Sequence, residues 1–362
     1  MKVSIGSKIV EGPYGGGNLF VKNLKNYLKK NNIDVIDHLD DNDIDIILLI
    51  NPLKYAETST YNHHDINYYV TFINPDALVV QRINECDERK NTTTINEQII
   101  KSNKVADFTI YVSSWLQGLY IVKGLDKSNS AVIMSGSDES IFKSSKKKID
   151  NSKFKLVTHH WSSNWNKGFN IYEKIDKLLK NEEWKERLDF TYIGNIPKDF
   201  IFKNSKVIKP LDDVKIAKLL KTFNGYITAS LNEPSGNHHI EAAQCGLPIL
   251  YINSGGIPEY CENFGVEFNE NNFEEKLKEF IEDYKKYEKN LVNYPYNATK
   301  MSKEYLDIFN NLIEKRKEIT TKRKKEKKVN VILYLIKSRV EKIVFNLYSK
   351  ISIKLSNLIK SK

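Results

Sequence analysis

Two glutamates eight positions apart, Glu233 and Glu241, are the residues in this chain best placed to do chemistry. A turn that contains Gly236 follows the first glutamate, and the second lies about one turn into an alanine-rich segment that predicts a helix. Residues 225–230, just before the pair, predict a buried strand. A strand, a glycine-containing turn and a helix N-terminus together bind phosphate, because free backbone N–H groups and the helix dipole face the ligand. Phosphate would repel both carboxylates, so we expect each glutamate to accept hydrogen bonds from hydroxyl groups of the same ligand, which favours a nucleotide-sugar.

This segment resembles the E-x7-E signature of retaining glycosyltransferases with the GT-B fold, of the family-4 type. Residues 246–248 (Gly-Leu-Pro) and 254–259 (Ser-Gly-Gly-Ile-Pro-Glu) resemble that family's continuation. An isolated pair of glutamates is more often a solvated part of an ordinary strand–turn–helix, since short motifs match by chance. The flanking matches favour the family, and the resemblance extends over about residues 1–315.

The resemblance implies a role for each catalytic residue. Glu233 would face the donor sugar near the reacting carbon, and Glu241 would accept the ribose hydroxyls. Lys167, which opens the first helix of the second half and matches the family's Lys-Gly pair, would contact the pyrophosphate, since a lysine at a helix start suits a phosphate as a point charge. Backbone N–H groups around Gly236 and Asn237 would stabilise charge on the departing phosphate.

The donor site departs from the family's pattern in one respect. The family usually has an arginine a few residues before this lysine, and residues 159–161 are His-His-Trp here. Either a histidine and Asn164 substitute for the arginine, or phosphate affinity is weaker. His238 and His239 lie inside the motif, and we expect one to touch the donor (His238 is our candidate) and the other to pack. We expect no metal or cofactor, because Lys167 and the helix dipole carry the charge.

Two segments of the first half follow predicted strands and are expected in the cleft. The resemblance places Gly15, Gly16 and Gly17 opposite the donor, although a flexible turn is the alternative. Arg82 and Asn84 stand where many family members have a histidine near the donor sugar, so we take them as acceptor-side candidates. They belong to a dense charge cluster that ends at Arg89, and a solvated loop with internal ion pairs is an equally good interpretation of it.

Alternating strand and helix patterns must position these residues. We predict an α/β protein with two Rossmann-like domains facing a cleft: an N-terminal acceptor domain at 1–142, a linker at 143–152 and a C-terminal nucleotide-sugar-binding domain at 153–315. Predicted strands span residues 3–9, 44–50, 77–80, 108–112, 131–134, 154–159, 188–193, 226–229 and 249–252. Predicted helices span residues 19–28, 62–70, 91–105, 168–179, 214–220 and 273–287. Ligands bind beyond the carboxyl ends of such strands, so both domains should line the cleft.

The remaining residues, 316–362, form a tail with a composition of its own. The net charge is +10, but residues 315–362 hold 16 Lys/Arg and 3 Asp/Glu, which leaves the body with 40 basic and 43 acidic side chains. A near-neutral body argues against nucleic-acid binding. Apolar residues recur every three to four positions from Ile332 to Leu358, which predicts a basic amphipathic helix. Contact with an anionic membrane is our interpretation, and packing on the body or a partner is the alternative.

These patterns favour a cytoplasmic protein that is peripherally attached to the cytoplasmic face of the membrane. The N-terminus lacks the apolar stretch of a signal peptide, and the three cysteines suit a reducing compartment. The expected partners are a nucleotide-sugar donor and a glycan or lipid-linked acceptor, with transfer of a hexosyl-type sugar. Two other functions stay open: a non-catalytic nucleotide-sugar-binding or scaffold protein, and a nucleotide-sugar epimerase on the same fold.

Overall fold

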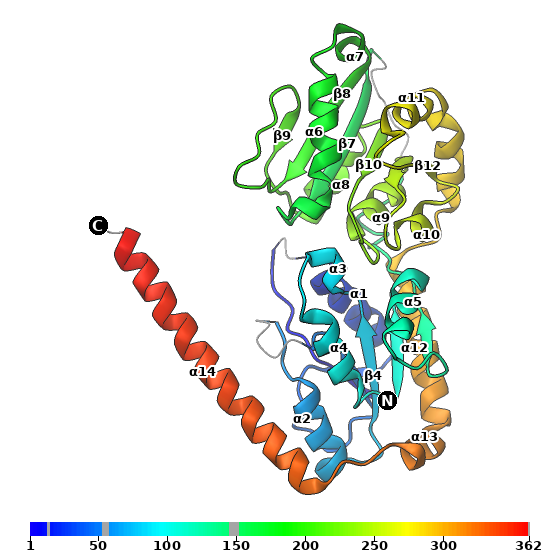
Figure 1. Cartoon of the computed structure of the whole chain (residues 1–362). Coiled ribbons are helices and arrows are strands. Elements are labelled where there is room, and N and C mark those ends of the chain that lie inside the picture. Colours follow the sequence, from blue (N-terminus) through cyan, green and yellow to red (C-terminus); the bar gives the residue numbers. More distant parts are fainter. Residues whose placement is uncertain (13–14, 53–57, 145–151, 361–362) are drawn as a thin grey trace.

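The computed structural model, which describes residues 1–12, 15–52, 58–144 and 152–360, has two α/β domains that lie one above the other (Figure 1). Each domain contains a six-stranded sheet in which all paired strands are parallel. The predicted pair of Rossmann-like domains is therefore confirmed. Most of the predicted linker, residues 145–151, lies outside the described residues.

The sheet of the N-terminal domain has the order β2-β1-β3-β4-β5-β6. Its strands are β1 (Lys2–Ile5), β2 (Asp34–Ile36), β3 (Ile46–Leu49), β4 (Leu78–Ile83), β5 (Phe108–Tyr111) and β6 (Ser130–Val132). Ile46 and Leu48 of β3 pack on one face of this sheet, whereas Ile47 and Leu49 pack on the other. Both faces are thus covered, which explains why the strand is apolar at every position.

The sheet of the C-terminal domain has the order β12-β11-β10-β7-β8-β9. Its strands are β7 (Phe154–His160), β8 (Leu188–Gly194), β9 (Lys206–Ile208), β10 (Gly225–Thr228), β11 (Ile249–Ile252) and β12 (Gly265–Phe268). Sequence patterns identified nine of the strands that the structure describes. The three strands that they missed, β2, β9 and β12, have three or four residues each and include exposed positions, so they lack a continuous apolar run.

Helices connect these strands and cover the sheets. In the N-terminal half they are α1 (Gly16–Lys30), α2 (His63–Tyr68), a π-helical turn (Tyr69–Ile73), α3 (Asp87–Lys90), α4 (Ile95–Asn103) and α5 (Ser114–Val122). The following part has a 3₁₀ turn (Trp165–Lys167), α6 (Phe169–Leu178), α7 (Glu182–Arg187), α8 (Asp213–Leu220), α9 (Asn237–Gln244), α10 (Ile257–Cys261), α11 (Phe273–Asn290) and a 3₁₀ turn (Leu291–Asn293). The chain ends with α12 (Ala298–Glu314), α13 (Arg316–Lys322) and α14 (Lys328–Lys360).

Helix α12 crosses back from the C-terminal to the N-terminal domain (Figure 1). It packs along α1, and its apolar face, which includes Tyr305 and Phe309, is part of the core under the N-terminal sheet. We expected the C-terminal domain to run to residue 315, but residues 298–314 belong to the N-terminal body by packing. An amphipathic helix pattern does not show which of two cores it will cover, so the sequence did not reveal this crossing.

The tail first packs on the N-terminal domain and then leaves it. Arg323 pairs with Asp107, and the first turns of α14 lie on α2, where Val331 and Leu335 are buried and Asn62 donates a hydrogen bond to Ser338. In the row of apolar side chains that the sequence predicted, Ile336, Val340 and Ile343 are exposed.

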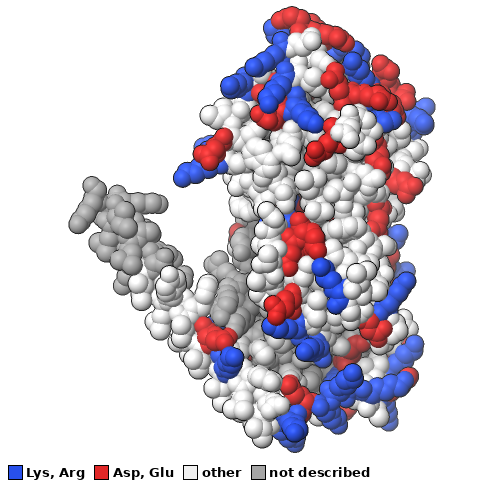
Figure 2. All heavy atoms as spheres, in the orientation of Figure 1, with Lys and Arg blue, Asp and Glu red and all other residues white. Residues whose placement is uncertain are grey.

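Beyond these contacts α14 projects away from the body (Figure 1). None of the helices that the structure describes combines the length and the apolar character needed to cross a membrane. Figure 2 shows basic and acidic side chains mixed over the body in that view, in keeping with its near-neutral charge.

Candidate active site

A cavity of about 580 Å³ lies between the two domains. Its walls come from segments that follow β1 and β4 in the N-terminal domain and β7 and β10 in the C-terminal domain, as expected for the carboxyl ends of parallel strands. The structure brings eleven predicted site residues to this cavity: Gly15, Gly16, Gly17, Arg82, Asn84, Lys167, Glu233, Gly236, Asn237, His238 and Glu241.

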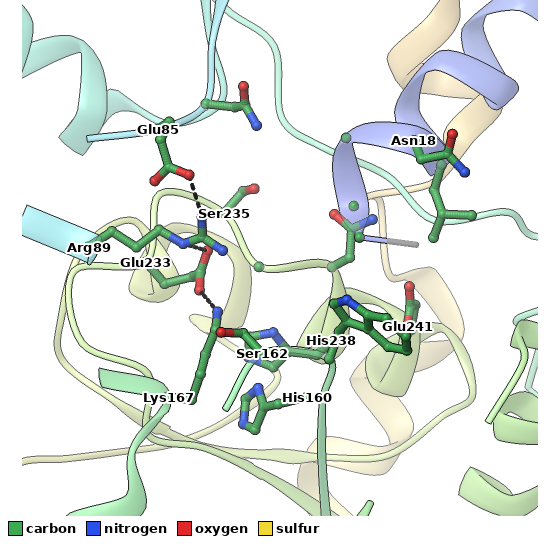
Figure 3. A pocket seen from close by; sticks show the side chains of 18 of the residues that line it. Asn18, Glu85, Arg89, His160, Ser162, Lys167, Glu233, Ser235, His238 and Glu241 are labelled. Atoms are coloured by element: carbon green, nitrogen blue, oxygen red, sulfur yellow. Dashed lines mark hydrogen bonds and ion pairs between the residues drawn. The ribbon is translucent and has the colours of Figure 1, made fainter. Parts of the chain in front are cut away.

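Glu233 is the centre of a chain of ion pairs that spans the cleft (Figure 3). Its Oε2 is 2.5 Å from Lys167 Nζ, and its Oε1 is 2.9 Å from Nε of Arg89, which comes from α3 of the other domain. Burial by itself raises the pKa of Glu233, but Arg89 and Lys167 outweigh burial and hold that pKa well below its ordinary value. Glu233 is therefore an ionised carboxylate whose two oxygens are each paired with a cation.

Arg89 was missing from the predicted site. Glu85 orients it, with Glu85 Oε2 at 2.7 Å from Arg89 Nη1 and 2.8 Å from Lys90 Nζ. The sequence did hold a signal, because the charge cluster that follows β4 stands where cleft residues are expected. The cluster does contain internal ion pairs, as the alternative interpretation proposed, but one of its cations also reaches Glu233.

Glu241 has different surroundings on the same wall of the cavity. It is buried, and its Oε2 lies 2.9 Å from His159 Nε2. Burial raises the pKa of Glu241, and the hydrogen bond with His159 offsets only part of this effect. The two glutamates of the motif thus have opposite pKa shifts, although both are buried.

Two histidines around the motif, His160 and His238, have lowered pKa values. Burial lowers the pKa of His160 and of His238 well below the ordinary value, and the neighbouring cation Lys167 adds to the effect. His238 lines the cavity and lies 2.8 Å from Thr228 Oγ1, whereas His239 does not line it and packs on Tyr260. Of the two, His238 is therefore the one that can touch a ligand in the cavity.

Two glycines of this cavity stand where an added Cβ would meet a neighbouring side chain. Gly236 has φ +76°, and a Cβ there would lie 2.7 Å from His239 Cε1 and 2.8 Å from His238 Cε1. Gly16 begins α1 on the opposite wall, and a Cβ on it would lie 2.9 Å from Cγ of Asn237 at the start of α9. The N-termini of helices from the two domains therefore approach each other across the cavity.

The other candidates differ in how far they reach the cavity. Arg82 is buried with its guanidinium carbon 4.0 Å from the ring centroid of Phe20, and burial lowers its pKa. Asn84 lines the cavity, but Asn164 does not; its side chain accepts a hydrogen bond from the backbone N–H of Asn166 and caps the turn before Lys167. Among the described residues, no group of three or more His, Cys, Asp or Glu side chains is arranged to hold a metal ion.

Known proteins share this architecture. One is the Anabaena protein HepE in complex with UDP and glucose, with a TM-score of 0.63 and 16% identity over 86% of this chain and 100% of that chain. A sucrose-phosphate synthase from Thermosynechococcus elongatus has a TM-score of 0.60 and 12% identity over 86% of this chain and 99% of that chain. The lipopolysaccharide outer core galactosyltransferase WaaB has a TM-score of 0.60 and 12% identity over 86% of this chain and 100% of that chain. The chain has the GT-B fold.

A match to a protein family covers a smaller part of the chain. Residues 198–299 match the family described as glycosyl transferases group 1, and this segment contains Glu233, Gly236 and Glu241. No curated protein matches the chain. The match is confined to the C-terminal domain, whereas the similarity to solved GT-B structures extends over both domains.

Proposed function

We propose that this protein is a retaining glycosyltransferase that transfers a hexosyl-type sugar from a nucleotide-sugar to a glycan or lipid-linked acceptor. The observation that supports this most is the arrangement of Lys167, Glu233 and Glu241 around the N-terminus of α9 in an interdomain cavity. A cation and a helix N-terminus favour phosphate, and the carboxylates on either side of them favour hydroxyl groups. A nucleotide-sugar carries these groups in one molecule.

Each residue then has a part in the reaction. Lys167 and the backbone N–H groups at Gly236 and Asn237 stabilise the negative charge that grows on the leaving phosphate. Glu233 accepts hydrogen bonds from the donor sugar, and Glu241 accepts them from the ribose. The acceptor hydroxyl attacks the anomeric carbon from the face that the phosphate leaves, and its proton passes to a phosphate oxygen. No protein nucleophile, metal or cofactor is required for this route.

A binding screen tests the donor site first. We expect UDP-, GDP- or ADP-sugars to raise the melting temperature of the wild type for one base only, and Glu241→Ala to abolish that shift. Val292→Ala, at an exposed position of the C-terminal domain, is the control. A folded wild type that none of these nucleotides stabilises would rule out the donor site.

Turnover separates transfer from the two other functions. We expect slow hydrolysis of the donor without acceptor and transfer with one, with the anomeric configuration of the product read by NMR. A scaffold would bind the donor without consuming it, and an epimerase would convert the donor sugar without any acceptor. Inversion at the anomeric carbon would contradict the retaining mechanism.

We further propose that α14 holds the protein on the cytoplasmic face of an anionic membrane, next to a lipid-linked acceptor. The exposed apolar row and the lysines of this helix support this interpretation. We expect the protein to sediment with vesicles of phosphatidylcholine and phosphatidylglycerol (7:3) and to stay in solution with phosphatidylcholine alone. Ile343→Glu should abolish sedimentation and Val292→Glu, also exposed, should not. Equal sedimentation of both variants would contradict membrane contact through α14.

A further inference from the structure

The C-terminal wall of the cavity is short of positive charge. Among the described residues, Lys167 is the only Lys or Arg that this domain contributes to the lining. Residues 153–315 contain one arginine, Arg187, which pairs with Glu183 and Glu282 on α7 and α11. A diphosphate carries two or more negative charges, so one lysine and a helix N-terminus leave part of that charge without a cation partner.

The N-terminal domain supplies a second cation at the same point. Arg89 Nε lies 2.9 Å from Glu233 Oε1, and Lys167 Nζ lies 2.5 Å from Glu233 Oε2. A single carboxylate separates the two cations, so both can reach one small anion between them. Arginine is suited to this place, since its planar guanidinium binds phosphate through two parallel hydrogen bonds.

The backbone around Arg89 is fixed to the loops that carry the other two groups. Asn166, which precedes Lys167, donates from Nδ2 to the carbonyl oxygen of Arg89 at 3.1 Å. Asn232, which precedes Glu233, donates from Nδ2 to the carbonyl oxygen of Glu88 at 3.2 Å. Helix α3 is therefore held against the C-terminal domain beside Lys167 and Glu233.

From this geometry we propose that Arg89 is a ligand of the donor diphosphate, supplied across the cleft by the N-terminal domain. The proposal rests on the proposed function, because it deepens the assignment of the same site. When a diphosphate lies between Arg89 and Lys167, both cations turn from Glu233 to phosphate oxygens. The carboxylate of Glu233 is then free to accept hydroxyl groups of the sugar. The phosphate-binding site is complete only when both domains contribute to it.

Titration calorimetry with a ligand series tests this role. The series is the nucleoside, its monophosphate and its diphosphate, for whichever of uridine, guanosine or adenosine binds the wild type. We expect Arg89→Ala to weaken binding of the diphosphate at least tenfold, to weaken the monophosphate less and to leave the nucleoside unchanged. Arg89→Lys, which keeps the charge but loses the planar fork, should recover part of the loss. Arg187→Ala removes the same charge from α7 and should bind all three ligands as the wild type does.

The outcomes are distinguishable. If the wild type binds no diphosphate, the proposed function and this proposal fail together. If the wild type binds and Arg89→Ala binds the diphosphate equally well, only the role of Arg89 is overturned. An equal loss for all three ligands would also overturn it, because Arg89 would then only hold the domains together. The melting temperature of each variant without nucleotide checks that it is folded, and Arg89→Lys keeps the test valid if Arg89→Ala does not fold.

Discussion

Glu233 and Glu241 belong to one short segment, yet their surroundings are opposite. Glu233 faces the other domain and is paired with two cations, Lys167 and Arg89, one from each side of the cleft. Glu241 also lines the cavity, but the partner that the described residues provide for it is a histidine of its own domain, His159. The pKa of Glu233 is lowered and that of Glu241 is raised. Two residues of the same type at a fixed spacing thus differ: Glu233 is an anion paired with two cations, and Glu241 is a carboxyl group whose charge is only weakly compensated.

The largest effect that this comparison predicts is on transfer. Glu233→Gln removes the charged acceptor that we propose for the donor sugar and should lower kcat/KM by about 10- to 100-fold, the scale of a charged hydrogen bond worth ~1.5–3 kcal/mol. Glu241→Gln should raise KM for the donor more than it lowers kcat, since the ribose that we propose as its partner lies far from the reacting carbon. Steady-state kinetics with varied donor measures both. Equal changes in kcat for the two variants would show that the glutamates do not have separate roles.

The same comparison predicts opposite effects on stability. The pKa of Glu233 in the folded protein lies below its ordinary value of 4.5, so its contribution to stability is present above that pH and is lost as the pH falls further. The pKa of Glu241 lies above 4.5, so its contribution falls as the pH rises through the raised pKa. At pH 7, Glu233→Gln should lower the free energy of unfolding by roughly 2–3 kcal/mol, somewhat less than for a fully buried pair because Arg89 is partly exposed. Glu241→Gln should raise it.

Urea unfolding of the wild type and both variants, measured from about pH 2 to pH 8, checks these signs. Relative to the wild type, Glu233→Gln should lose less stability on acidification, because the group that titrates in acid is gone. A variant pair with parallel pH profiles would contradict the opposite pKa shifts.

The sequence was sufficient to predict the C-terminal wall of the cavity, because local backbone structure forms it. Gly236, Asn237 and Glu241 could be placed because a strand, a glycine turn and a helix start follow one another within a few residues. It was insufficient for the parts that depend on contacts between distant segments. Arg89 meets Glu233 only after the domains face each other, and α12 returns to α1 from nearly three hundred residues away in sequence. Asn164 stands beside the right lysine, but its side chain caps the local turn, which spacing alone does not reveal.

The smallest predicted effect concerns how closely the two domains approach. A Cβ on Gly16 would lie 2.9 Å from Cγ of Asn237, so Gly16→Ala should push the start of α1 away from the start of α9. The neighbouring Gly17 has no atom within 4 Å of an added Cβ, so Gly17→Ala is a matched control for the change in backbone freedom. Alanine is more favourable than glycine in a helix by ~0.5–1 kcal/mol, so we expect Gly17→Ala to keep or raise the melting temperature.

Because the side chain of Asn237 can shift, Gly16→Ala should weaken donor binding only a few-fold, and the loss should fall on the diphosphate, which needs groups from both domains. Calorimetry with the diphosphate and the nucleoside measures it, and an equal loss for both ligands would mean that the approach of the two helices does not set the distance between Arg89 and Lys167.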